Sequence, residues 1–69
     1  MPEILITLNG EQLPIAGNID LETLVGRLAL PAKRLAVEMN GNVIRRADWP
    51  QTIVSHGDKI EVVHFVGGG

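Results

Sequence analysis

The sequence predicts a single small α+β domain in which one sheet packs on one helix. Three observations lead to this fold class. An alternating apolar segment at 3–8 precedes the hairpin-type pair Asn9-Gly10, one amphipathic helical pattern follows, and the chain closes on a strongly β-prone segment at 60–66. Two strands, one helix and then further strands are typical of a two-layer domain whose sheet buries one face against the helix.

The first two strands are expected to form a hairpin. Residues 3–8 alternate with a period of two, which indicates a strand with Ile4, Ile6 and Leu8 on one face and Leu5 and Thr7 on the other. Asn9-Gly10 predicts a type I′ turn, because both central positions of that turn need a positive φ. The chain then returns over 11–16. Pro14 has no amide to donate, so this second strand is expected at an edge of the sheet.

One main helix is expected after Asp20, whose carboxylate can accept hydrogen bonds from the free amides of the first turn. Its buried face follows the i, i+3, i+4, i+7 rule and consists of Leu21, Leu24, Val25 and Leu28. Gly26 weakens the helix by about 1 kcal/mol relative to alanine, and we expect it to let another segment approach. Pro31 restricts Leu30, so the helix is expected to end by that residue.

The second half of the chain is expected to add two or three strands. Residues 35–39 alternate, Asn40-Gly41 is a second hairpin-type turn, and 43–44 form a short return strand. Residues 45–50 indicate a polar connection in which Trp49 packs over the edge of the core. Residues 56–58 indicate a further turn.

The last strand is expected to have an inner and an open face. Ile60 and Val62 should face the helix, and His64 shares that face, where we expect it to be partly buried and hydrogen-bonded. Val63 and Phe65 then lie on the open face, beside Leu5 if the first and last strands are neighbours.

Apolar residues on this open face are unexpected, because a sheet face that meets only water alternates with polar residues. Exposed apolar patches often mark partner sites. We therefore expect Leu5, Val63 and Phe65 to form a partner-contact patch. The alternative is that Phe65 folds over the end of the sheet and is simply packed.

Size and composition exclude several classes of protein. The 69 residues include no cysteine and two histidines, too few for a zinc site without a carboxylate partner. A net charge of −2 with one Trp and one Phe argues against nucleic-acid binding. The N-terminus lacks the features of a signal peptide, and no apolar run approaches the roughly 20 residues that cross a bilayer. We expect a cytoplasmic chain that binds no metal, membrane or cofactor and is a monomer when free.

The chain closes on Gly67-Gly68-Gly69, which we expect to form a flexible tail beyond a domain at 1–66. Three extended residues span at most about 10–11 Å, enough to enter a narrow catalytic channel, and glycine has no Cβ to clash there. The carboxyl group of Gly69 is ionised at neutral pH and must be activated before it can react. Attack on the α-phosphorus of ATP would give an acyl adenylate, with metal and cationic groups supplied by a separate enzyme. Alternatively, terminal glycines are a loose end.

Several segments of the chain together carry a family resemblance. They are Leu8-Asn9-Gly10-Glu11, the helix at 21–28, Ala36-Val37-Glu38-Met39-Asn40-Gly41, Arg45-Arg46 with Trp49, His56-Gly57-Asp58 with the strand after it, and Phe65-Val66-Gly67-Gly68-Gly69. With these segments the chain resembles the ThiS/MoaD family of ubiquitin-like sulfur carriers, in particular its thiamine-biosynthesis members, over nearly its whole length. The glycine end alone is moderately specific, and its combination with the other segments is strong.

The resemblance implies a β-grasp, ubiquitin-like fold with a mixed sheet of four to five strands, whose first and last strands are central, parallel neighbours. It also implies that a ThiF-like adenylyltransferase, using ATP and Mg, adenylates Gly69 and that the product becomes a thiocarboxylate. A ThiG-like thiazole synthase then receives the sulfur. Gly67 and Gly68 would enter the partner's active site, and the chain would be a co-substrate without catalytic residues of its own.

Three alternatives stay open beside this interpretation. A sulfur carrier for molybdopterin synthesis ranks second, because those relatives are usually longer and lack the segment around Trp49. A ubiquitin-like modifier that forms isopeptide bonds with lysines would share the activation step. A plain interaction module would not need the tail at all.

Overall fold

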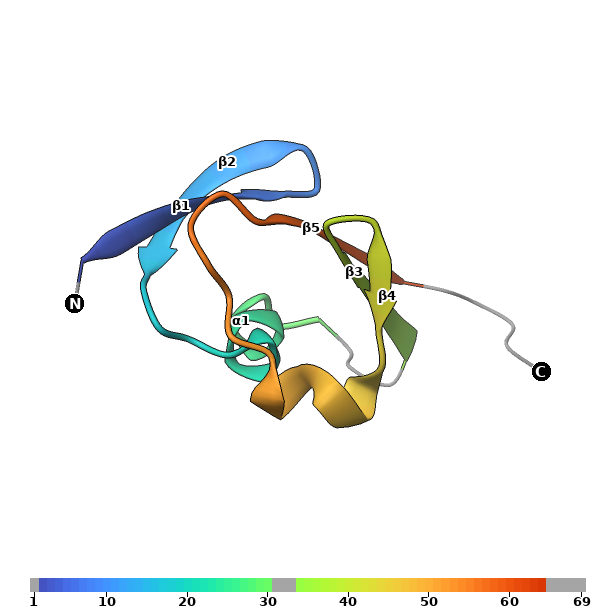
Figure 1. Cartoon of the computed structure of the whole chain (residues 1–69). Helices are drawn as coiled ribbons and strands as arrows, with labels where there is room; N and C mark the ends of the chain where they lie inside the picture. Colours follow the sequence, from blue (N-terminus) through green and yellow to red (C-terminus); the bar gives the residue numbers. More distant parts are fainter. Residues whose placement is uncertain (1, 31–33, 65–69) are drawn as a thin grey trace.

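The structure is a computed structural model that describes residues 2–30 and 34–64 (Figure 1). The elements in chain order are β1 (Glu3–Leu8), β2 (Glu11–Ala16), α1 (Leu21–Arg27), β3 (Leu35–Met39), β4 (Asn42–Ile44), the 3-10 helix η2 (Arg46–Gln51) and β5 (Lys59–His64). The five strands form one sheet, and α1 packs on one of its faces. This arrangement confirms the expected α+β class.

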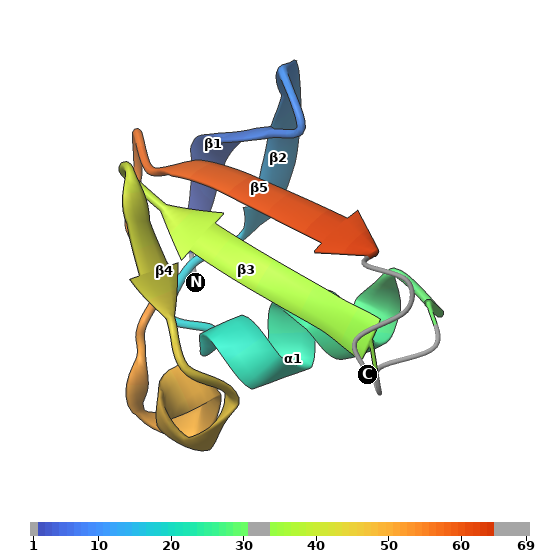
Figure 2. The same cartoon turned by 90° about the vertical axis from the view of Figure 1, so that its right-hand side faces the viewer.

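The strand order β2-β1-β5-β3-β4 places the first and last strands at the centre of the sheet. Figure 2 shows β5 running between β1 and β3, with α1 below the sheet. β1 and β5 are parallel, whereas β1–β2, β3–β4 and β3–β5 are antiparallel. The sheet is therefore mixed, with the β-grasp topology. β2 lies at an edge of the sheet, as expected for a strand that contains Pro14, because proline has no amide hydrogen to donate to a second neighbouring strand.

Both Asn-Gly pairs form the hairpin turns that the sequence predicts. The φ angles are 49° and 84° at Asn9 and Gly10, and 54° and 87° at Asn40 and Gly41. Positive φ at both central positions matches the right-handed twist of the flanking strands. The two turns lie on either side of β5, since β1 and β3 are its neighbours in the sheet.

The helix begins as predicted and ends before Leu30, as expected. Asp20 is the N-cap, and its Oδ2 accepts a hydrogen bond from the Thr23 amide at 2.9 Å. The last helical residue is Arg27, because Ala29 already has a φ of +57°. Gly26 is exposed, and a Cβ built there would meet nothing within 4 Å, so the expected close approach of another segment was wrong.

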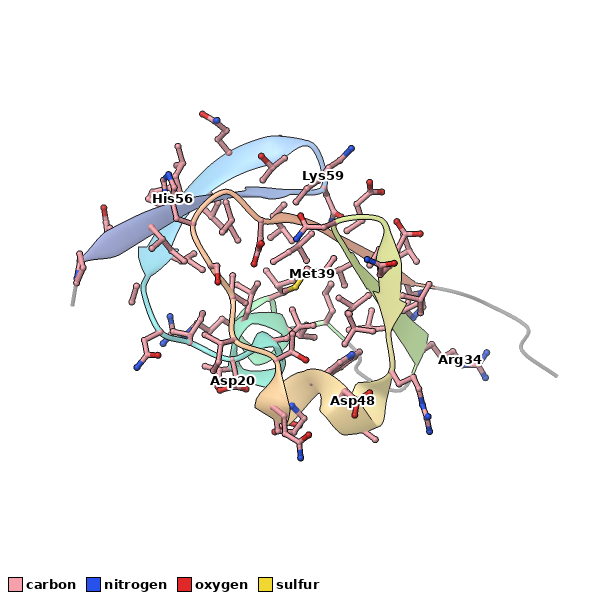
Figure 3. The ribbon with its side chains drawn as sticks, in the orientation of Figure 1. Asp20, Arg34, Met39, Asp48, His56 and Lys59 are labelled. Carbon is pink, nitrogen blue, oxygen red and sulfur yellow. The ribbon has the colours of Figure 1, made fainter. Side chains whose placement is uncertain are left out.

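The core lies between α1 and the inner face of the sheet. Its fully buried side chains include Ile6, Leu21, Leu24, Ile60, Val37 and Val54. These residues come from both layers, and Ile60 and Val62 of β5 face the helix as expected. Met39 is partly buried and packs against this core from β3 (Figure 3).

Residues 46–51 form a 3-10 helix, not the irregular polar connection that the sequence predicted. Trp49 is 3% exposed, so it belongs to the core and not merely to its edge. Its indole Nε1 donates to the Ile44 carbonyl at 3.0 Å, which satisfies the one polar atom of a buried ring. The Arg46 guanidinium lies over the same ring at 5.0 Å from its centroid, within the range of a cation–π contact.

His64 is exposed, although alternation along β5 assigns it to the inner face. The expectation that it is partly buried was wrong. Alternation assigns a side chain to a face of the sheet but does not fix how deeply it is buried. Leu35, the residue that pairs with His64 in β3, is buried, whereas His64 is the last residue of β5 and stays exposed.

The N-cap gives the fold a specific dependence on pH. The two hydrogen bonds from Thr23, from its hydroxyl at 2.7 Å and from its amide, hold the pKa of Asp20 below its ordinary value of 3.8. A carboxyl whose pKa is depressed by folding stabilises the folded state above its unfolded pKa, and this contribution is lost as the pH falls through the folded pKa.

We therefore expect Asp20→Asn to flatten the fall in melting temperature below about pH 4, because the asparagine still caps the helix but does not titrate. Thermal unfolding followed by circular dichroism between pH 2 and pH 7 checks this. Asp48→Asn is the control, and an unchanged acid limb in Asp20→Asn would contradict the assignment.

Candidate functional site

β5 is the strand that leads from the core towards the expected functional tail. Gly67, Gly68, Gly69 and Phe65 lie outside the described residues, as does the boundary expected after residue 66. Their roles stay predictions. The structure shows how the strand before them is held and what surrounds it.

β5 pairs with more residues of β3 than of β1. Along β3 the register covers five residue pairs, from Leu35 opposite His64 to Met39 opposite Ile60. Along β1 it covers two pairs, Thr7 with Lys59 and Leu8 with Ile60. The second half of β5 therefore extends beyond the end of β1.

Asn9 continues the hydrogen bonding between β1 and β5 beyond Leu8, the last residue of β1. Its backbone amide donates to the Ile60 carbonyl at 2.9 Å. Its side-chain Oδ1 then accepts from the Val62 amide at 2.8 Å, where a further strand residue would otherwise supply a carbonyl. The turn residue thus holds the last strand near its carboxyl end.

Asn40 does the same at the start of β5 from the other side. Its Oδ1 accepts from the Lys59 amide at 2.9 Å, and its backbone amide donates to the Lys59 carbonyl at 2.7 Å. Its Nδ2 donates to Asp58 Oδ1 at 3.0 Å, while Asp58 Oδ2 accepts from the Ser55 amide at 2.7 Å. The turn expected at 56–58 is present, and these hydrogen bonds of Asp58 stabilise it.

His56 also has a structural partner that sequence reasoning missed. Its Nδ1 accepts from the Leu5 amide at 3.0 Å, while the Gly57 amide donates to the Leu5 carbonyl at 2.8 Å. Figure 3 shows the ring beside β1. The bond requires that Nδ1 carry no proton. The hydrogen bonds of Leu5 to His56 and Gly57 extend the β1–β5 pairing to residues that precede β5.

The expected apolar patch is divided by the strand register. Leu5 and Val63 are both exposed on the open face, at 37% and 53%. Leu5, however, lies opposite Gly57, and the six residues from there to Val63 span about 20 Å along the strand. The expectation that Leu5 lies beside Val63 was therefore wrong. Their role in partner contact stays a prediction.

Val63 instead lies in an apolar groove over β5, β3 and β4. It pairs with Ala36, while Val43 of β4 is 69% exposed and pairs with Glu38. The groove has a volume of about 100 Å³. Its lining consists of Ala36, Val37, Glu38, Val43, Glu61 and Val63. This groove is absent from the sequence-based prediction.

Among residues 2–30 and 34–64, no three His, Asp or Glu side chains gather closely enough to hold a metal ion. Arg46 contacts Trp49, and Arg45 precedes η2 as an exposed residue. No helix in the described part of the chain has the length and apolar character to cross a membrane.

The model of the ThiS family matches residues 6–69. The chain belongs to the ThiS family. The crystal structure of the thiamine biosynthesis protein (ThiS) from Geobacter metallireducens superposes with a TM-score of 0.86 at 32% identity, covering 96% of this chain and 100% of that one. This ThiS structure confirms the predicted fold, and the family supports a thiamine-related sulfur carrier.

Two thiazole synthases also contain a segment similar to this ThiS chain. That of Paramagnetospirillum magneticum is 34% identical over 64 residues, and that of Magnetococcus marinus 39% identical over 64 residues. Each match covers 93% of this chain and 20% of the synthase. The chain thus spans about a fifth of the length of these relatives.

Proposed function

We propose that this chain is a sulfur carrier protein of thiamine biosynthesis and that it carries sulfur as a thiocarboxylate on Gly69. The family match over residues 6–69 carries the proposal, because it includes the three closing glycines together with the folded domain. In this proposal the folded domain is the part that partner enzymes bind, and the reacting group is the carboxylate of Gly69.

The chemistry begins with activation of an unreactive group. A carboxylate oxygen of Gly69 attacks the α-phosphorus of ATP, and pyrophosphate leaves. A sulfide-equivalent nucleophile then displaces AMP and leaves a thiocarboxylate. Mg and cationic side chains that stabilise the phosphate would belong to a ThiF-like adenylyltransferase, and this chain would bind no cofactor.

The sulfur acceptor in this proposal is a ThiG-like thiazole synthase. The two thiazole synthases that contain a segment similar to this chain support that choice, since such a segment would place carrier and synthase in one polypeptide. Gly67 and Gly68 would pass through the partner's channel without a Cβ to obstruct it. A cytoplasmic location and a monomeric free state are part of the same proposal.

Intact mass spectrometry tests the carrier chemistry. The native, untagged protein, first shown to end at Gly69, is incubated with the adenylyltransferase, ATP, Mg and a cysteine-derived sulfur source. We expect a gain equal to the replacement of one oxygen by sulfur, localised to Gly69. The gain should be absent without ATP and in a variant that lacks Gly69.

Three results would contradict the proposal. An unchanged mass, in a mixture that charges a known carrier, would favour an interaction module. Lysine-linked adducts of this chain on other proteins would favour a ubiquitin-like modifier. Transfer of the sulfur to a molybdopterin precursor, with no transfer to thiazole, would exclude the thiamine branch.

A further inference from the structure

The open face of the sheet carries two carboxylates directly opposite each other. Glu38 of β3 pairs with Glu61 of β5 in the antiparallel register, and both side chains project away from α1. Residues that pair in this way have Cβ atoms about 4.5–5.5 Å apart, and like charges at such positions destabilise a sheet. Folding therefore brings two negative charges together on the neighbouring strands β3 and β5.

Nothing in the described part of the chain neutralises this pair. The structure records no ion pair at Glu38 or Glu61 among residues 2–30 and 34–64. Lys59 precedes Glu61 by two residues and is diagonal to Glu38, yet it forms no recorded ion pair with either carboxylate. The repulsion between the two carboxylates therefore lowers the stability of the isolated domain.

The carboxylates flank the apolar groove. Glu61 lies between Lys59 and Val63 along β5, and Glu38 lies directly between Glu61 and Val43 across the sheet. Protein interfaces combine an apolar core with a polar rim and place opposite charges across from each other. Exposed apolar side chains beside two like charges therefore fit a partner that brings an apolar side chain and a positive charge. Glu61 is half-buried and Glu38 is exposed.

We propose that this groove docks the thiazole synthase through a basic side chain seated between Glu38 and Glu61 and an apolar side chain between Val43 and Val63. The inference rests on the proposed function for the identity of the partner. A single arginine can donate to both carboxylates at once, since its guanidinium presents five N–H donors in a planar fork. Binding would convert a repulsive pair into an ion-paired one.

Position along β5 supports this choice of surface. The groove is formed on the same strand that leads to residues 65–69, and Val63 is the last but one residue of β5. A partner that holds the groove thus holds the chain immediately before the segment that would enter its active site. Leu5, at the opposite end of the open face, would not serve this purpose.

Opposite effects on stability and binding test the inference. The double variant Glu38→Gln/Glu61→Gln keeps the shape of both side chains and removes the repulsion, so we expect its melting temperature to rise by about 2–5 °C. Binding to the purified thiazole synthase, measured by isothermal titration calorimetry, should weaken about 10–100-fold and lose most of its salt dependence.

Matched variants separate the groove from general surface effects. Glu3→Gln/Glu11→Gln makes the same change in net charge outside the groove, and both residues are exposed, so binding should stay within about twofold. Val43→Ser should weaken binding, whereas Ile53→Ser should not, although Ile53 is also exposed at 51%.

Each contrary result identifies what has failed. If the wild-type chain binds the synthase and the groove variants bind equally well, the inference is wrong and the proposed function stands. If the variants lose ATP-dependent loading but keep synthase binding, the groove serves the adenylyltransferase, which also overturns the inference. If the wild-type chain does not bind the synthase at all, both the proposed acceptor and this inference are wrong.

Discussion

Trp49→Ala is expected to lower the free energy of unfolding by about 3–5 kcal/mol, the usual cost of truncating a buried aromatic residue. The ring is 3% exposed and belongs to the main core cluster, where η2 meets α1. A domain of this size has roughly 3–10 kcal/mol of stability in total. Much of the variant should therefore be unfolded under conditions in which the wild type is folded.

Urea denaturation followed by far-ultraviolet circular dichroism measures this loss without relying on tryptophan fluorescence. Trp49→Phe is the informative control, because it keeps an aromatic ring but removes the indole N–H that the Ile44 carbonyl accepts. We expect Trp49→Phe to cost about 1–2 kcal/mol. A loss below 1 kcal/mol for Trp49→Ala would mean that the buried Trp49 ring contributes little to the stability of the core.

The elements that the sequence predicts well are those fixed by local chemistry. Period-two alternation identified β1 and β3 to their ends, and the N-cap at Asp20 placed the start of the helix correctly. Both Asn-Gly turns need positive φ at two positions, which few other residue pairs tolerate. These signals depend on the nearest few residues, so one sequence is sufficient to find them.

The division of the open-face patch shows where local reasoning ends. Alternation correctly assigns Leu5 and Val63 to one face of the sheet. It does not say how far β5 is displaced along β1, because a parallel pair separated by some 50 residues has no turn to set its register. If β5 were shifted along β1 by an even number of residues, each side chain would stay on the same face of the sheet but would have different neighbours. The pairing of Leu5 with Gly57, and of Val63 with Ala36, comes from the tertiary structure.

The second roles of Asn9, Asn40 and His56 were hidden for a related reason. Each residue has a sufficient local explanation as part of a turn, so its side chain gives no further signal in the sequence. All three accept backbone amides from segments between 19 and 53 residues away. Only the folded chain brings these amides within reach, and together they fix both ends of β5.

Asn9→Gly is expected to loosen the end of β5 while leaving the first hairpin intact. Glycine adopts the positive φ of this turn without strain, so the substitution removes the side chain alone. The amide of Val62, a residue that is 6% exposed, then loses its acceptor, which costs about 1–3 kcal/mol. Hydrogen exchange should show faster exchange of the Val62 amide, by about 10–100-fold, with little change at Ile6 in β1.

Asn9→Asp is the matched control, because its carboxylate can still accept from Val62 and aspartate also tolerates a positive φ. Its protection at Val62 should resemble that of the wild type. Equal protection at Val62 in all three proteins would show that the Asn9 side chain does not hold the strand. Loss of protection in Asn9→Gly alone would mean that the strand before residues 65–69 is fixed by a turn residue distant in sequence. The proposed carrier would then present its tail from a strand that is held beyond the end of β1, because the Val62 amide, which follows the last residue paired with β1, is held by the Asn9 side chain.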